Sequence, residues 1–101
     1  METSSFIDYH YSDEVHDAVV KRVDRQHERL QVEIESAEGQ SVTFEFNGVQ
    51  SVDAHQAEGM LLYSLSEMQS HDPYRRFVFT NSDEDDSARL EVVAREIHRV
   101  P

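Results

Sequence analysis

Cysteine is absent from this 101-residue sequence, glycine occurs three times and proline twice, and Lys21 is the single lysine among nine lysines and arginines. The lack of cysteine excludes disulfides, thiolate zinc sites and cysteine nucleophiles, so the fold has to depend on packing alone. There is no Gly-rich phosphate loop, and neither a G-x-S-x-G nor an H-E-x-x-H motif occurs. We therefore predict a protein that is not an enzyme and needs no cofactor.

Long apolar runs are also missing. No stretch approaches the roughly 20 apolar residues of a membrane-spanning helix, and the N-terminal METSSFIDYHY lacks the basic and apolar regions of a secretion signal. The length fits one domain and leaves no room for a second hydrophobic core. We expect a single domain over residues 1–101, located in the cytoplasm and without a membrane partner.

Negative charge is what the sequence has in excess, with 21 acids against nine lysines and arginines and a formal net charge of −12. Such a surface repels the phosphates of nucleic acids and anionic membranes, so we expect neither as a partner. A cationic protein is the natural partner of this charge. Solubility in a saline cytoplasm would also favour acids, and charge alone does not separate the two interpretations.

Strict alternation of apolar and polar residues marks LQVEIE at 30–35 and VTFEFN at 42–47, on either side of Gly39. This pattern predicts an antiparallel hairpin with one apolar face. The NG pair at 47–48 suits a tight turn, after which VQSV begins a further short strand. RRFVFTN at 75–81 predicts another strand, with both phenylalanines on one face.

Three segments fit either a helix or a strand: 12–25, 59–70 and 87–99. As a strand, the middle segment would place Leu61, Tyr63 and Leu65 on one face. Frequent valine and the need for at least three strands favour strands throughout. We therefore predict a mainly β fold, either a single small antiparallel sheet, a half-barrel or a sandwich built from hairpins. The alternative is an α+β fold with helices near 12–25 and 87–99.

Three stretches carry a resemblance to known proteins: HDAVV at 16–20, FNGVQSV at 46–52, and RRFVFTN with ARLEVVAREI within 75–97. Together they resemble small β-rich bacterial proteins of unassigned function. Some proteins of that kind are grouped with the immunity proteins of polymorphic toxin systems. The resemblance implies a β-rich fold and an inhibitor-like role, and it transfers no catalytic residue.

Four consecutive acids at 83–86 lie between the strand at 75–81 and the last ambiguous segment. They fit a solvated hairpin tip, and they also fit a surface that attracts a basic protein, with exposed aromatics supplying affinity. The candidate partner-binding residues are Asp83, Glu84, Asp85, Asp86, Tyr63 and Tyr74. Arg75 and Arg76 are the paired bases available to form ion pairs with this acidic loop.

Histidine and aspartate gather in HYSDEVHD at 10–17. On a helix beginning near Ser12, spacings of three and four would bring these side chains together as an N/O ligand set. The weak metal candidates are His10, Asp13, His16 and Asp17. A histidine beside an aspartate is more often a surface pair, and we predict no metal site.

These observations predict a small non-catalytic acidic protein that captures a basic protein, in the manner of an immunity protein or inhibitor. A homo-oligomeric β module, including a homodimer formed by edge pairing, is the first alternative. Two further alternatives are a regulator that mimics DNA with its carboxylates and a metal-binding enzyme centred on His16.

Overall fold

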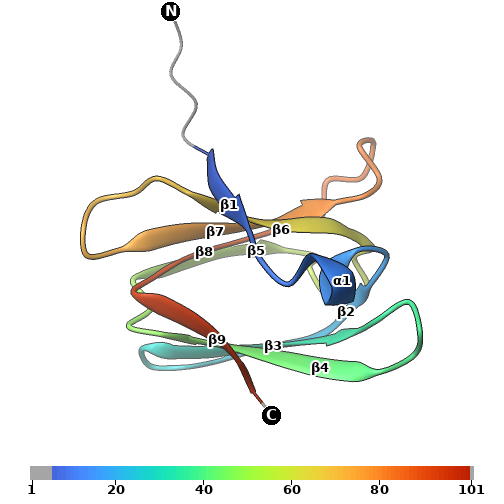
Figure 1. The fold of residues 1–101 in the computed structure, drawn as a ribbon, viewed down its shortest axis with the longest axis horizontal. Helices are drawn as coiled ribbons and strands as arrows, with labels where there is room; N and C mark the ends of the chain where they lie inside the picture. Colours follow the sequence, from blue (N-terminus) through green and yellow to red (C-terminus); the bar gives the residue numbers. More distant parts are fainter. Residues whose placement is uncertain (1–5, 101) are drawn as a thin grey trace, which may run out of the picture.

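Two antiparallel β-sheets pack face to face in the structure, a computed structural model that describes residues 6–100 (Figure 1). The five-stranded sheet has the strand order β1-β6-β7-β8-β5, and the four-stranded sheet has the order β2-β3-β4-β9. The elements are β1 (Phe6–Tyr9), α1 (Ser12–Val15), β2 (Val19–Gln26), β3 (Arg29–Glu35), β4 (Ser41–Asn47), β5 (Ser51–His55), β6 (Leu62–Met68), β7 (Arg75–Asn81), β8 (Arg89–Ala94) and β9 (Glu96–Val100). The predicted mainly β fold is confirmed, in its sandwich form.

The predicted hairpin is β3 and β4, whose alternating apolar residues all point into the sandwich. Leu30 lies opposite Phe46, and the pairing continues in register along both strands to the turn before Ser41. The buried residues of the pair have 3% exposure or less. The short strand expected to begin in VQSV at 49–52 is present as β5, from Ser51, and the predicted strand at 75–81 is present as β7.

The helices of the α+β alternative do not form. Segment 12–25 contains one helical turn, which ends at Val15, and then continues as β2; segment 87–99 forms β8 and most of β9. Asp17 has a left-handed backbone (φ 65°), which stops the helix and turns the chain into β2. Pairing of β2 with β3 then satisfies the backbone groups that a longer helix would have satisfied internally.

Four buried phenylalanines join the two sheets at the centre of the core. The ring of Phe46, from the four-stranded sheet, lies 5.4 Å from that of Phe77 and 6.0 Å from that of Phe79, both on β7. Phe44 contacts the half-buried ring of Tyr11 at 4.9 Å. Each fully buried phenylalanine contributes roughly 1.5–3 kcal/mol to folding.

Among residues 6–100 there is no helix of the length and apolarity that a membrane crossing needs.

Within residues 6–100 the chain changes sheets three times: through α1 between β1 and β2, at Gly48 between β4 and β5, and at Arg95 between β8 and β9. The crossings at Gly48 and Arg95 are close in space. These two crossings lie against each other, because the Arg95 amide donates to the carbonyl of Asn47 at 3.0 Å. Gly48 has φ +65°, and a Cβ added there would meet Arg95 Cγ at 2.7 Å. A glycine is therefore favoured at this position both by the positive φ of the backbone and by the closeness of the Arg95 side chain.

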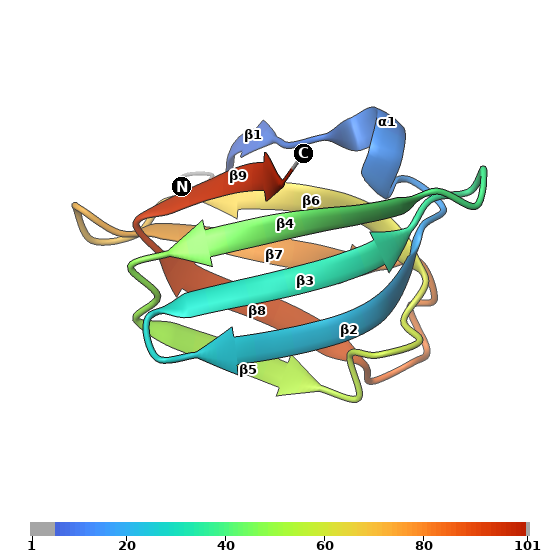
Figure 2. The same ribbon diagram turned by 90° about the horizontal axis from the view of Figure 1, so that it is seen from below.

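One side of the sandwich is covered by the N-terminal segment, as β1, α1 and β9 lie close together in Figure 2. Arg99 on β9 forms an ion pair with Glu14 on α1 and so links the two sheets. Leu62, the first residue of β6, donates its amide to the carbonyl of Ala18, and its carbonyl accepts the amide of Asp17. These bonds hold α1 beside the first residues of β6.

We predict that Gly48→Ala lowers the free energy of unfolding by about 2–4 kcal/mol, because alanine is strained at positive φ and its methyl group collides with Arg95. Gly39→Ala is the matched control, since Gly39 also has positive φ (+84°) but open space around it. The control should cost about 1 kcal/mol. Urea denaturation of both variants measures the difference, and equal losses would show that Arg95 moves away freely.

Candidate functional site

Exposed apolar side chains gather along β1 and the first residues of β6. The large hydrophobic residues that the described part of the chain leaves exposed are Phe6, Ile7, Tyr9, Leu61 and Tyr63. Tyr9 and Tyr63 are the most open, at 54% and 56% exposure. Exposed apolar side chains that lie close together on a small, highly charged protein make this region the candidate for an interaction surface.

A break in strand pairing explains why Tyr63 faces outward. The register between β6 and β7 shifts between Leu62 and Ser64, which leaves Tyr63 as the extra residue of a bulge. Leu62 and Leu65 are consequently both buried, and Tyr63 is exposed. The expected face of Leu61, Tyr63 and Leu65 is therefore wrong, because the bulge reverses the alternation at this point.

Tyr9 and Tyr63 are two walls of an open hollow of about 430 Å³, which we call the Tyr9–Tyr63 groove. Its lining residues are Tyr9, Ser12, Asp13, His16, Tyr63 and Ser64. The ring of His16 lies edge-on to that of Tyr63 at 5.5 Å, and the ring of Phe6 lies 4.6 Å from that of Tyr9. Both tyrosines therefore rest against a second ring.

The groove is an acidic environment. The two stretches that form it, 6–20 and 59–74, contain no lysine or arginine. Asp13 is exposed and makes no ion pair with any described residue, whereas its neighbour Glu14 is paired with Arg99. The Asp13 carboxylate is thus available to a ligand.

A buried ion pair fixes β1 to the five-stranded sheet. Glu67, on β6, has only 8% of its side chain exposed and accepts two hydrogen bonds from Arg75 on β7, at 2.9 and 2.7 Å. His10, just after β1, lies 2.8 Å from the same carboxylate and donates its backbone amide to Leu65. These contacts anchor the strand that carries Tyr9.

The hydrogen bonds from Arg75 lower the pKa of Glu67 to about 2, with a smaller contribution from His10 and against the opposing effect of burial. The same pair raises the pKa of Arg75. Glu67 is therefore ionised at neutral pH, and its charge is already compensated. The contacts with Arg75 and His10 give this carboxylate a structural role.

The four acids of the predicted binding loop lie in the turn between β7 and β8, as the sequence predicts for a hairpin tip. Two of them bond to the loop itself: Asp83 accepts the amide of Asp85 at 3.0 Å, and Asp86 accepts the amide of Ala88 at 3.2 Å. Asn81 closes the loop by donating to Asp86. Glu84 and Asp85 are exposed, and their carboxylates have no partner among the described residues.

Tyr63 and Tyr74, predicted together as aromatic contacts, lie at opposite ends of β6. The antiparallel pairing of β6 with β7 places Tyr63 beside Asn81, whereas Tyr74 belongs to the turn after Met68. The length of β6 separates them by roughly 20 Å. Tyr74 is instead covered by Arg95, whose guanidinium lies 5.8 Å from the centre of the ring.

The paired arginines do not reach the acidic loop. Arg75 binds Glu67, and Arg76 binds Glu91 on β8 at 2.9 Å. The expected ion pairs with the loop are therefore wrong, because both arginines lie at the other end of β7. Consecutive strand residues point to opposite faces, so one arginine points into the sandwich and the other outward.

The weak metal candidates are not brought together. His10 is bound to Glu67, and His16 lies 3.4 Å from Asp17 at the surface. The helix that would have aligned these residues ends at Val15. Within residues 6–100, no group of three or more histidine and acidic side chains has the arrangement of a metal site.

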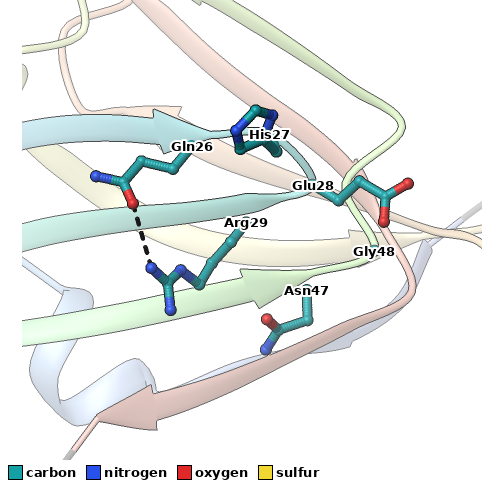
Figure 3. A pocket seen from close by; sticks show the side chains of 6 residues that line it. All are labelled: Gln26, His27, Glu28, Arg29, Asn47 and Gly48. Carbon is teal, nitrogen blue, oxygen red and sulfur yellow. Dashed lines mark hydrogen bonds between the residues drawn. The ribbon is translucent and has the colours of Figure 1, made fainter.

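A second hollow lies at the end of the β2–β3 hairpin (Figure 3). Arg29 donates to Gln26 at 3.2 Å, while the Glu28 carboxylate points away from this pair. Asn47 and Gly48 complete the wall. The polar groups in this hollow do not converge on one point, so the hollow has no arrangement suited to catalysis.

No family model, curated protein or solved structure matches the chain. The resemblance to immunity proteins therefore stays a prediction.

Sequence reasoning missed β1, the role of Tyr9 and the buried ion pair. A signal for the pair was present: Glu67 is two residues from buried Leu65, and Arg75 is two residues from buried Phe77. A charge in phase with core positions on two successive strands indicates a buried pair.

We predict that Glu67→Gln lowers the free energy of unfolding by about 1–3 kcal/mol at neutral pH, because Arg75 loses its ionised partner. The contribution of Glu67 is complete above its ordinary pKa of 4.5 and disappears as pH falls toward about 2. The difference between wild type and variant should therefore narrow over this interval in denaturation experiments. The exposed control Glu38→Gln should stay within about 0.5 kcal/mol of wild type throughout. A Glu67→Gln difference that does not narrow as pH falls toward about 2 would contradict this assignment.

We also predict that Asp86→Ala costs about 0.5–1.5 kcal/mol, since it removes the acceptor for Ala88 and Asn81. Glu84→Ala should leave the free energy of unfolding within about 0.5 kcal/mol of wild type. Urea denaturation distinguishes the two roles. If both substitutions are equally neutral, Asp86 does not stabilise the loop.

Proposed function

We propose that this protein is a small non-catalytic binding module that captures a basic protein through the Tyr9–Tyr63 groove. The observation that supports this proposal is the combination of exposed aromatic rings with an unpaired carboxylate, Asp13, in a region without lysine or arginine. Aromatic residues at the centre of an interface supply most of the binding energy, and surrounding charge selects the partner.

The acidic loop extends the same binding surface. Ser82, at the start of the loop, donates its amide to the carbonyl of Leu61, so the loop begins next to the residues that lead into Tyr63. Figure 1 shows α1 and the β7–β8 loop at the same end of the sandwich. Glu84 and Asp85, which have no structural bonds, are the acids best placed to attract a cationic partner. Charges of this kind accelerate association more than they strengthen the bound complex.

This proposal retains Tyr63 and the acidic loop and leaves out Tyr74, which lies at the other end of β6. An immunity-like or inhibitor-like role in the cytoplasm fits this arrangement, because such a protein needs a complementary surface and no reaction chemistry.

Self-association through an open sheet edge is less well supported. The side chain of Asp8 accepts the amide of Tyr9 at 2.8 Å, which places a carboxylate on the exposed strand β1. Two copies meeting at this edge would bring like charges together, on chains that each carry −12. A homodimer through β1 is therefore disfavoured.

A DNA mimic needs unpaired carboxylates lined up along one surface. On the outer face of the four-stranded sheet, Glu45 instead accepts bonds from Gln31 and Asn47, which lower its pKa. Arg29 and His98 also lie within 4 Å of it, at 3.9 and 3.1 Å. Internal compensation of this kind weakens any resemblance to a row of phosphates.

Affinity capture from a lysate of the native source tests the proposal, using wild type, Tyr9→Ala/Tyr63→Ala, Glu84→Gln/Asp85→Asn and Tyr74→Ala as baits. We expect one basic protein to bind wild type and Tyr74→Ala. The double tyrosine variant should bind it at least tenfold more weakly, which corresponds to about 1.4 kcal/mol or more. The loop variant Glu84→Gln/Asp85→Asn should associate with the partner more slowly than wild type at low salt and at the same rate as wild type at high salt.

Glu35→Gln/Glu38→Gln is the charge-matched control, because it removes two exposed acids from the β3–β4 hairpin on the other sheet. Circular dichroism should show that every bait is folded. Recovery of the same proteins by wild type and by the double tyrosine variant, or of no protein by either, would contradict the proposal.

A further inference from the structure

We infer that the Tyr9–Tyr63 groove binds a single cationic side chain, the guanidinium of an arginine or the ammonium of a lysine on the partner. This inference rests on the proposed function and specifies the group that the groove recognises. The faces of aromatic rings attract cations within about 6 Å, and tyrosine is among the residues that do so. Tyr9 and Tyr63 both line the groove, so a cation placed there lies within reach of two aromatic rings.

The polar groups in the lining are suited to a donor-rich ligand. Asp13 offers a carboxylate, and Ser12 and Ser64 offer hydroxyl oxygens, all of which accept hydrogen bonds. Guanidinium and ammonium groups are donors only. An anion would instead meet the carboxylate of Asp13, with no lysine or arginine contributed by the groove-forming stretches 6–20 and 59–74.

The free carboxylate is a consequence of the way that α1 is attached. Glu14 is occupied by Arg99, and this ion pair holds the helix against β9. Asp13, next in the chain, lines the groove and has no ion pair among the described residues. Its charge is balanced by solvent ions or by a bound cation, and the two tyrosine rings in the same groove lining favour the bound cation.

The groove is also preorganised. His16 packs edge-on against Tyr63, Phe6 packs against Tyr9, and the contacts of Glu67 with His10 and Arg75 fix β1 in place. A site whose walls are already ordered loses less conformational entropy on binding. Because the hollow is open, the affinity for a free side-chain analogue should be weak, on the order of millimolar.

A backbone-amide NMR titration of the isotope-labelled protein tests the inference, with N-acetyl-arginine amide, N-acetyl-lysine amide and N-acetyl-citrulline amide as probes. Citrulline has nearly the shape of arginine but no charge. We expect the charged probes to shift the resonances of Tyr9, Asp13, His16 and Tyr63, and citrulline to have no effect at the same concentration. A response to the arginine probe alone identifies a site for guanidinium, and a response to the lysine probe alone identifies a site for ammonium. Equal responses identify a site that recognises positive charge in either group.

Variants separate the rings from the carboxylate. Asp13→Asn and Tyr63→Ala should each weaken binding of the charged probe by about threefold to tenfold, while Tyr63→Phe, which keeps the ring face, should stay within about twofold. Glu38→Gln is the control, because Glu38 is an exposed acid in the β3–β4 turn of the other sheet and does not line the groove. Equal binding of citrulline, unchanged binding by Asp13→Asn, or shifts confined to residues 83–86 would overturn the inference.

The two proposals fail in different ways. If the double tyrosine variant loses the captured protein while the charged probes give no shifts in the groove, the groove contacts the partner by other chemistry, and only this inference is wrong. If the probes bind in the groove but the variant still captures the same protein, the cation site is real and the proposed function is wrong.

Discussion

Contact between two apolar sheet faces is the constraint on which the rest of this structure depends. Without cysteine, a chain of this length has to gain its stability from burial, and the rings of Phe46, Phe77 and Phe79 supply the largest contact between the layers. Two layers require a chain that crosses between them. Gly48 and Arg95 make two of the three crossings at one place, where the backbone of one crossing bonds to the other. The remaining edges of both sheets are then left open to solvent or to a partner.

The buried ion pair converts one of these open edges into a defined site. β1 pairs with β6 on one side only, and all four of its side chains are exposed, so burial contributes little to its position. Glu67 compensates for this by binding Arg75 from the core sheet and His10 from the chain that follows β1. A buried carboxylate with two partners is sensitive to geometry and permits one arrangement of the strand. The position of Tyr9 in the same groove lining as Tyr63 follows from that arrangement.

Local patterns predicted the elements whose alternation is unbroken, and tertiary structure decided the others. The hairpin at 30–47 was predictable because every second residue is apolar and faces one core. The exposure of Tyr63 was not, because the bulge adds one unpaired residue to β6 and so reverses the alternation of faces at this point. The groove combines residues 9–16 with residues 63–64, and no pattern within a single segment indicates that they meet. The acidic loop was located correctly, but the internal bonds of Asp83 and Asp86 depend on the backbone conformation of the turn.

The arginines that form ion pairs lie on the strands, and none of them lines the Tyr9–Tyr63 groove. Arginines that form ion pairs lie on the strands of both sheets, where each one neutralises a nearby acid: Arg22, Arg29, Arg75, Arg76, Arg89 and Arg99. Self-repulsion within the fold is reduced wherever such a pair forms. The groove lining and the tip of the β7–β8 loop receive no such arginine, so Asp13, Glu84 and Asp85 form no ion pair with any described residue. Acids elsewhere within residues 6–100, such as Glu28 and Asp72, also lack an ion pair there, and what sets the groove apart is that an acid lies beside exposed tyrosine rings. In the proposed function, this negative charge attracts a cationic partner and disfavours contact with a second copy of the chain, which carries the same charge.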